Sequence, residues 1–456
     1  MSDPADLAVV SFPPDFIWGV ATSAFQIEGG RNEAGKGDSI WDRFSDQGRL
    51  RVPGDVACDH FHRWEEDLDL LERLGVPTYR FSVSWPRVIP DGDGRVNQAG
   101  LDFYRRLVAG LRDRGIAPVA TLYHWDLPQA LQDKGGWASR DTIDAFARYS
   151  RIVAGALGEE TGQWITQNEP WVTAMLGHRD GIFAPGIADW RTALRVGHHL
   201  LVGHGLAAQE IRTVLSGASV GIALDCRPVE AVSESDQDRQ AARHFDGFRN
   251  RWFFDPVFGL GYPDDMMKSY QDRGRIEPDL IAADDMRAIA TPIDFLGVNY
   301  YTTVSVGVGG EEVDRPEAEP GPEPQPGYTE MGWRVDPDGL ARYLRYLSGT
   351  YRPLSILVTE NGAGYSDGPD ETGVIDDRRR IDYLESHVRS MAAARLDGVP
   401  VGGYFVWSLM DNVEWLEGFS QRFGLVWVDE TTLERIPKRS FDWYRRLVTT
   451  GTLSSP

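Results

Sequence analysis

An alternation of short apolar runs with amphipathic stretches is the feature that most constrains the fold of this chain. Eight runs rich in β-branched and aromatic residues recur along its 456 residues, at 16–20, 78–84, 117–123, 163–167, 219–225, 294–299, 355–359 and 403–408. Runs that are apolar at every position are typical of strands buried on both faces, as in a parallel sheet. The pattern therefore predicts parallel strands joined by helical crossovers.

The segments between the runs have helical periodicity. Ile381, Leu384, Val388 and Met391 form one apolar stripe, with charged residues on the opposite face. Eight strands alternate with helices, and no part of the chain has a composition that suggests a second domain. This pattern predicts an α/β fold, a single (β/α)₈ TIM barrel over residues 1–456 with long βα loops at its C-terminal face. An open doubly wound sheet is the alternative, but residues 21–30 lack the G-x-G-x-x-G turn expected after its first strand.

One segment departs from this alternation. Residues 311–326 contain five prolines and five glutamates, within a polar stretch that spans 305–330. Such a composition suits either a domain linker or a long loop. Because it follows a strand end and the barrel still needs two more strands, we expect a long mobile loop at the rim.

Composition excludes several classes of partner. The chain has 69 Asp and Glu against 47 Lys and Arg, a net charge of −22, and only four of its basic residues are lysines. Nucleic acids and anionic membranes require basic patches, and no apolar run reaches the 18 or so residues of a membrane span. The 15 Trp, 16 Tyr and 19 Phe instead indicate a neutral small-molecule ligand with faces that stack on rings. No motif indicates an oligomeric state.

Cysteine and histidine patterns point to neither a metal nor a cofactor. Cys58 and Cys226 are far apart and match no metal-ligand spacing, so we expect two buried thiols. The nine histidines show no ligand spacing either. Residues 1–6 lack the basic and apolar regions of a signal peptide, which predicts a cytoplasmic protein.

Polar and aromatic side chains gather at predicted strand ends, where the chemistry of a barrel is located. A lone glutamate there is more often a helix cap, and a lone tryptophan is more often a core residue. Here seven of the eight predicted strands end in such residues, which is more than a rim of ordinary solvent-exposed side chains would explain. These residues are Gln26, Arg80, His124, Trp125, Asn168, Glu169, Asn299, Tyr301, Glu360, Trp407, Glu414 and Trp415.

Two carboxylates stand out because each follows a buried strand directly. Glu169 and Glu360 follow the fourth and seventh strands, which lie on opposite sides of a barrel, so both side chains can face one axial cleft. Two glutamates across a cleft lined with tryptophan fit glycoside hydrolysis, which needs a proton donor and a nucleophile or activated water. The alternative is an internal ion pair with Arg80 or His124.

Two short strings carry a family resemblance. Thr-Gln-Asn-Glu-Pro (166–170) and Val-Thr-Glu-Asn-Gly (358–362) resemble the two signatures of glycoside hydrolase family 1, the β-glucosidase family. The resemblance spans nearly the whole chain. Further motifs lie in order at 12–29, 79–87, 123–128, 295–301, 407–415 and 422–425.

This resemblance implies a retaining mechanism, in which Glu169 is the general acid/base and Glu360 is the nucleophile. It implies that Arg80, Asn299 and Tyr301 support the nucleophile. Retention predicts carboxyl groups about 5–5.5 Å apart. The resemblance also implies a set of sugar-binding residues, Gln26, His124, Trp125, Asn168, Trp407, Glu414, Trp415 and Phe423, and a leaving-group side formed by Trp333, Trp171 and His178.

The implied activity is hydrolysis of terminal non-reducing β-D-glucosyl residues from cellobiose, short cello-oligosaccharides and aryl β-glucosides. A β-galactosidase or β-fucosidase of the same family is an alternative, and so is a non-catalytic sugar-binding barrel, which would normally have lost one carboxylate. The branch of the family that acts on 6-phosphoglycosides carries Ser, Lys and Tyr where this chain has Glu414, Gln421 and Phe423. A carboxylate at 414 repels a phosphate, so neutral glycosides are expected.

Overall fold

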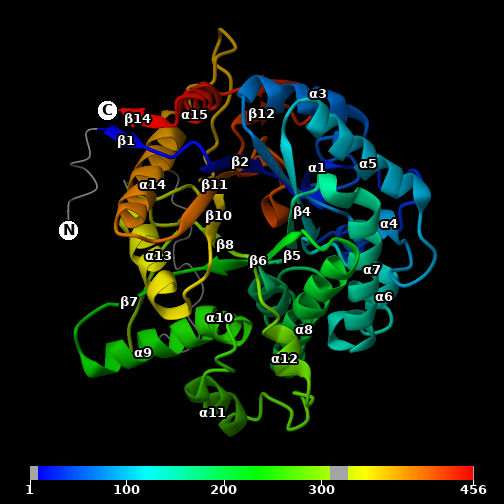
Figure 1. Cartoon of the computed structure of the whole chain (residues 1–456), viewed down its shortest axis with the longest axis vertical. Coiled ribbons are helices and arrows are strands. Elements are labelled where there is room, and N and C mark those ends of the chain that lie inside the picture. The colour runs from blue at the N-terminus through cyan, green and yellow to red at the C-terminus, as the bar shows by residue number, and fades with distance from the viewer. Residues whose placement is uncertain (1–8, 309–326, 455–456) are drawn as a thin grey trace.

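The computed structural model describes residues 9–308 and 327–454, and a closed barrel of parallel strands lies at its centre (Figure 1). The first barrel strand, β2, pairs with the last, β11, which closes the sheet. Each of the eight predicted runs overlaps one barrel strand, so the predicted fold is confirmed. The strands are β2 (Ile17–Ala21), β3 (Thr78–Ser82), β4 (Ala117–Tyr123), β5 (Gln163–Asn168), β6 (Ser219–Cys226), β8 (Phe295–Tyr300), β10 (Ile356–Asn361) and β11 (Val401–Trp407).

Long helices surround the barrel and cover its outer face (Figure 1). They are amphipathic because their apolar residues repeat at helical spacing: in α14, Ile381, Leu384, Val388 and Met391 are all buried, as their periodicity predicts. The long outer helices are α3 (His60–Leu74), α5 (Gln98–Asp113), α7 (Asp141–Leu157), α8 (Trp190–Val214), α13 (Pro337–Tyr351), α14 (Arg378–Leu396) and α15 (Arg439–Thr450).

Shorter elements fill the loops. The longest excursion lies between β6 and β8 and carries α9 (Asp236–Asp246), α10 (Trp252–Val257), α11 (Asp264–Asp272) and α12 (Asp285–Ile289). A π-helical segment, Gly247–Arg251, joins α9 to α10. The other short helices are α1 (Ala24–Ile27), α2 (Ile40–Asp46), α4 (Trp85–Val88), α6 (Gln129–Gln132), Gly136–Ala138, Gly158–Glu160, Val172–Arg179 and Trp415–Ser420.

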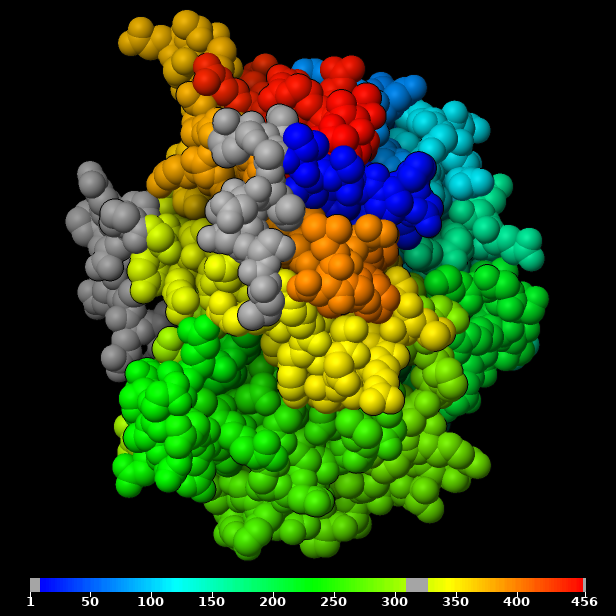
Figure 2. All heavy atoms as spheres, turned by 60° about the vertical axis from the view of Figure 1, so that its left-hand side comes forward, coloured from blue at the N-terminus to red at the C-terminus, as the bar shows by residue number. Residues whose placement is uncertain are grey.

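Three two-stranded sheets lie outside the barrel. They are β1 (Val9–Ser11) with β14 (Thr452–Ser454), β7 (Val229–Ala231) with β9 (Val304–Val306), and β12 (Val426–Val428) with β13 (Arg435–Pro437). The first of these joins the two ends of the described chain. Figure 2 shows the N-terminal segment in blue lying against the C-terminal segment in red.

Apolar side chains fill the barrel below the strand ends. Val119, Ile165, Ala223, Phe295, Leu357 and Phe405 form one buried cluster, each from a different strand. Gly19 on β2 makes room for the Phe405 ring, since a Cβ at position 19 would lie 2.4 Å from that ring. The packed interior leaves the carboxyl ends of the strands as the place where polar side chains converge.

Three further expectations concern the proline-rich loop, the two cysteines and membrane-spanning helices. The predicted loop at 305–330 lies largely outside the described residues, which omit 309–326. Cys58 and Cys226 are buried and unpaired, as predicted. Within the described ranges, no helix combines the length and apolar character needed to cross a bilayer.

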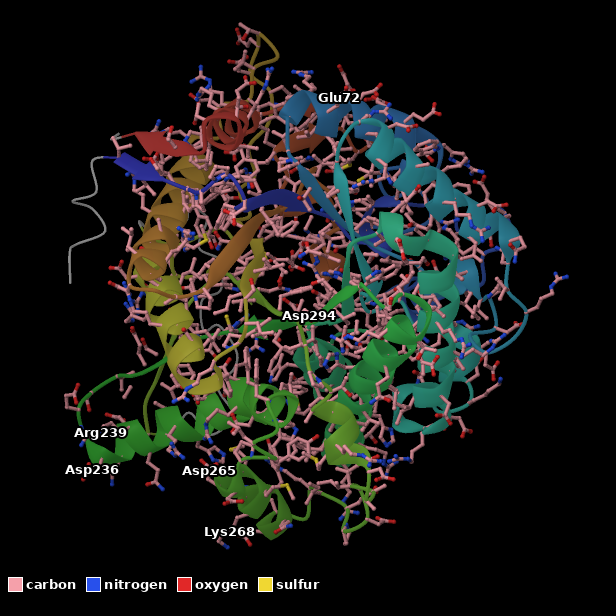
Figure 3. All side chains as sticks on the ribbon, viewed as in Figure 1. Glu72, Asp236, Arg239, Asp265, Lys268 and Asp294 are labelled. Carbon is pink, nitrogen blue, oxygen red and sulfur yellow. The ribbon has the colours of Figure 1, made fainter. Side chains whose placement is uncertain are left out.

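Charged side chains cover the outer helices and pair locally. Figure 3 shows Asp236 and Arg239 of α9 and Lys268 of α11 at the outer edge of the molecule. Asp236 pairs with Arg239, and Lys268 pairs with Asp272 one helical turn away. Exposed pairs of this kind each add at most about 1 kcal/mol to the free energy of unfolding. The exposed pairs on these helices therefore contribute little to the stability of the fold.

The close contact between α8 and α12 generates a stability prediction. A methyl group at Gly205 on α8 would place its carbon 1.7 Å from the backbone oxygen of Ala288 on α12, and backbone does not move aside easily. We expect Gly205→Ala to reduce the free energy of unfolding by roughly 1–3 kcal/mol and to lower Tm in a thermal melt.

Gly155→Ala on α7 is the matched control. A Cβ at Gly155 meets no atom of the described chain within 4 Å, and alanine favours helix over glycine by about 1 kcal/mol. This variant should hold or raise Tm at the same scan rate. An unchanged Tm in Gly205→Ala would show that the two helices separate without penalty.

Candidate active site

Glu360 lies at the end of β10 and is bound on both carboxylate oxygens. Arg80 Nη1 donates to its Oε1 at 2.7 Å, and the Tyr301 hydroxyl donates to its Oε2 at 2.6 Å. Arg80 comes from β3 and is 1% exposed. Two charge-assisted hydrogen bonds orient this carboxylate and favour its ionised form.

Glu169 lies directly after β5 and faces the same cavity as Glu360. Asn299 Nδ2, from β8, donates to its Oε1 at 2.8 Å. The backbone of Glu169 is left-handed, with φ of 48°, a conformation that non-glycine residues adopt rarely and mostly at functional sites. Its backbone N–H donates to the oxygen of Ala223 on β6 at 2.9 Å, which fixes this turn against the neighbouring strand.

The two glutamates differ in their electrostatic surroundings. Burial raises the pKa of Glu169 well above its usual range, and the carboxylates of Asp225 and Glu360 raise it further. Burial also raises the pKa of Glu360, but the Arg80 guanidinium and the Tyr301 hydroxyl counter that rise. Of the two, Glu169 is therefore the group that keeps a proton and Glu360 is the group that loses one.

A network of amide side chains links the two glutamates. Asn168 Oδ1 accepts from Arg80 Nη2 at 2.6 Å and from Asn299 Nδ2 at 3.1 Å. Asn299 Oδ1 accepts from the hydroxyl of Thr359, the residue before Glu360, at 2.7 Å. Asn299 lies near the nucleophile as well, because its side-chain hydrogen bond lowers the pKa of Glu360, and it also donates to Glu169.

A third carboxylate, Glu414, lies at the far end of the cavity. Gln26 Nε2 donates to its Oε2 at 3.3 Å and to Asn412 Oδ1 at 2.9 Å. Burial, together with the nearby Glu360 carboxylate, raises the pKa of Glu414 to about 8. His124 Nε2 lies 3.2 Å from the Asn168 amide nitrogen, and burial lowers the pKa of its ring well below the usual range. The cavity thus offers both donors and acceptors for hydroxyl groups.

Aromatic rings form the remaining walls. The His124 ring is nearly parallel to those of Trp407 and Trp415, with centroids 5.7 and 6.2 Å away. Trp125 packs against Trp415 at 4.4 Å. Rings at these positions present flat apolar faces next to the polar groups, as sugar recognition requires.

The cavity has a volume of about 150 Å³, and most of the predicted site residues line it. Glu169, Glu360, Asn299, Tyr301, His124, Trp125, Trp407, Glu414, Trp415, Phe423 and Trp333 all do so. Gln26, Arg80 and Asn168 lie directly behind this lining and bind it through the hydrogen bonds given above. In the described chain, no cluster of three or more His, Cys, Asp or Glu side chains is arranged to bind a metal ion.

Trp333 and Phe423 both line the cavity, and their ring centroids are 6.2 Å apart. Trp171 and His178, which were expected on this leaving-group side, are not among the lining residues. The Trp171 ring packs against the Arg249 guanidinium, 3.6 Å away, and His178 Nδ1 bonds the backbone oxygen of Thr173 at 2.8 Å. Both belong to the helical turns after Glu169, which direct these side chains into the surrounding protein.

Sequence reasoning missed several lining residues, among them Asp225, Cys226, Arg227 and Arg249. The signal for Asp225 was present, because it ends the fifth predicted strand, the one whose end contributed no candidate residue. Arg249 carried no such signal, since it comes from the long excursion between β6 and β8. Asp225 and Arg249 form a buried ion pair in the cavity wall.

Known proteins share both the sequence and the fold. The profile of glycosyl hydrolase family 1 matches residues 9–452. A β-glucosidase A from Acetivibrio thermocellus is 44% identical over 451 residues, covering 97% of this chain and 99% of the relative. A bifunctional β-D-glucosidase/β-D-fucosidase from Bifidobacterium breve is 42% identical, covering 96% of this chain and 98% of the relative.

A solved structure agrees with these relatives. The family 1 β-glucosidase from Thermotoga maritima superposes with a TM-score of 0.92 at 43% identity, covering 98% of this chain and 99% of that one. The match includes the barrel and the loops that carry the cavity. This chain belongs to glycosyl hydrolase family 1.

Proposed function

We propose that this protein is a retaining β-glucosidase that removes terminal non-reducing β-D-glucosyl residues from cellobiose, short cello-oligosaccharides and aryl β-glucosides. The observation that carries the proposal is the contrast between two buried glutamates in one cavity. Glu360 is held as a carboxylate by Arg80 and Tyr301, whereas the surroundings of Glu169 favour its protonated form. A nucleophile beside a proton donor is the arrangement that retention requires.

In the first step, a Glu360 oxygen attacks the anomeric carbon while the bond to the leaving oxygen breaks. Glu169 gives its proton to that oxygen, and a glycosyl ester on Glu360 forms. In the second step, Glu169 takes a proton from water as the water attacks the same carbon. The ester bond breaks, Glu360 is released as a carboxylate, and the product has the configuration of the substrate.

The electrostatics of the cavity suit this exchange of roles. While Glu360 is an ester it carries no negative charge, so its share of the rise in the pKa of Glu169 disappears. Because its pKa is lower in this intermediate, Glu169 stays ionised after giving up its proton and can take a proton from the attacking water. One residue therefore acts as acid and as base in successive steps.

The polar groups of the cavity suit a neutral sugar. His124 and Glu414 in the lining, with Gln26 and Asn168 hydrogen-bonded to them, supply donors and acceptors for hydroxyl groups, and Trp407 supplies a face for the sugar ring. The relatives named above carry the name β-glucosidase, and one is also named a β-D-fucosidase. A phosphorylated sugar is disfavoured, because burial and the Glu360 carboxylate already raise the pKa of Glu414 to about 8, so further negative charge beside it is unfavourable.

The proposal extends to organisation and location. We take residues 1–456 to act as a single catalytic unit, since the family match covers 9–452. A cytoplasmic location is consistent with the two unpaired thiols, Cys58 and Cys226.

Replacing the nucleophile tests the mechanism. Glu360→Ala should lower kcat for an aryl β-glucoside by roughly 10⁴-fold or more, because no glycosyl ester can form. Added azide should restore turnover by attacking the opposite face of the sugar and should yield the α-glucosyl azide, identified by NMR. Glu72→Ala, which removes an exposed glutamate of α3, is the control and should retain full activity. Full activity in Glu360→Ala would rule out this nucleophile.

Replacing the acid/base gives a different pattern. Glu169→Gln removes the proton donor, so kcat/KM for phenyl β-glucoside should fall by about 10²–10⁴-fold. With 2,4-dinitrophenyl β-glucoside the loss in kcat/KM should be much smaller, because that leaving group departs without a proton. Equal losses for the two substrates would contradict the assigned role.

A substrate panel tests sugar preference. We expect the ratio of kcat/KM values for 4-nitrophenyl β-glucoside and its galactoside, fucoside and 6-phosphoglucoside counterparts to favour the glucoside. The fucoside is the informative competitor, because a relative is named for both activities. A higher kcat/KM for the galactoside or fucoside would reassign the sugar specificity while leaving the mechanism in place.

A further inference from the structure

The fifth barrel strand brings an ion pair to the cavity that the mechanism above does not use. Asp225, on β6, pairs with Arg249 of the π-helical segment Gly247–Arg251. Both side chains are buried, with 7% and 3% of their surfaces exposed. The flat face of Arg249 lies 3.6 Å from the Trp171 ring, so the guanidinium is held from two sides. Burial makes this pair electrostatically stronger than an exposed one.

The backbone places Asp225 beside Glu169. Glu169 N–H donates to the backbone oxygen of Ala223, two residues before Asp225 on the same strand, and alternate residues of a strand share a face. In the register between β6 and β8, Asp225 is the partner of Asn299, whose side chain donates to Glu169 at 2.8 Å. Asp225 and Glu169 therefore line one wall of the cavity.

We propose that Asp225, anchored by Arg249, is a positioning residue that keeps Glu169 protonated in the resting enzyme. The inference rests on the proposed function, because it concerns the acid/base of that reaction. Asp225 acts through its negative charge, and it needs no contact with the substrate. Arg249 holds the carboxylate in place and moderates its effect.

The charges around Glu169 support this assignment. The titratable side chains that line the cavity with it are His124, Asp225, Cys226, Arg227, Arg249, Tyr301, Glu360 and Glu414. Burial lowers the pKa of His124 and raises those of Cys226 and Tyr301, so these three are neutral near pH 7. Arg80 reaches Glu169 only through Asn168 and Asn299.

Among the groups that change the pKa of Glu169, Asp225 raises it more than Glu360 does, and Arg249 lowers it less than either carboxylate raises it. Asp225 also differs from Glu360 in what happens to it during the reaction. Asp225 forms no bond to the sugar, whereas Glu360 loses its charge in the glycosyl ester.

The experiment measures kcat/KM against pH for phenyl β-glucoside, which needs the proton of Glu169 in the free enzyme. Activity falls as pH rises through the pKa of that group. Asp225→Asn removes a negative charge at nearly constant volume, which stabilises ionised Glu169 and lowers its pKa. The alkaline limb should therefore move to lower pH by on the order of one unit.

A substitution of Arg249, the ion-pair partner of Asp225, should shift the alkaline limb in the opposite direction. Arg249→Gln removes a positive charge, so the alkaline limb should move to higher pH. The double variant Asp225→Asn, Arg249→Gln removes both charges and should fall between the two single variants. Asp397→Asn breaks an exposed Asp–Arg pair with Arg345 and is the matched control, for which we expect no shift. If Asp225→Asn does not fold, the shifts in Arg249→Gln and the double variant still decide the question.

The outcomes separate this inference from the proposed function. Alkaline limbs that coincide in all folded variants, or that move in the reverse directions, would overturn the role of Asp225 while β-glucoside hydrolysis by the parent protein stands. A parent protein that does not hydrolyse the glucoside would instead overturn the proposed function. With 2,4-dinitrophenyl β-glucoside the variants should differ much less, because that reaction depends little on Glu169 as an acid.

Discussion

The Arg80 guanidinium holds together the part of the structure on which the rest of the site depends. It donates from β3 to Thr121 on β4, to Asn168 on β5, and to both Thr359 and Glu360 on β10. A charge buried this deeply destabilises the fold unless it is paired and fully hydrogen-bonded. The same interactions that satisfy Arg80 therefore align the strand ends and set the orientation of the nucleophile. The position of Glu360 is thus a consequence of how the barrel accommodates a buried cation.

The contrast between the two glutamates follows from this arrangement. Arg80 bonds directly to Glu360, whereas no guanidinium of the described residues donates a hydrogen bond to Glu169. Glu169 instead receives one neutral donor, Asn299, and faces the carboxylate of Asp225. Two identical side chains thus acquire opposite chemistry from the strands that carry them. Because both lie at strand ends rather than on long loops, their separation is set by the rigid part of the molecule.

The barrel and most residues of the active site were predictable from the sequence, for reasons that particular residues illustrate. The barrel strands were visible because their apolar runs are buried on both faces, and Glu169 and Glu360 were visible because each interrupts such a run at its end. Trp171 does not line the cavity, because closeness in sequence to Glu169 does not determine the direction of a side chain in the following helix. Arg249 was invisible, since its role depends on a π-helical turn and a partner 24 residues earlier. Pairings between distant segments are set by tertiary packing, which local patterns do not encode.

The closure of the barrel between β2 and β11 has a consequence for biosynthesis. The strand that completes the sheet, Val401–Trp407, is made after nearly nine-tenths of the chain, and β1 finds its partner only at Thr452–Ser454. While the ribosome is still extending the chain, β2 has one unpaired edge and the apolar interior is open on that side. The nascent protein therefore exposes a strand edge until Val401–Trp407 has been made, and chaperones that cover such edges would protect it up to that point.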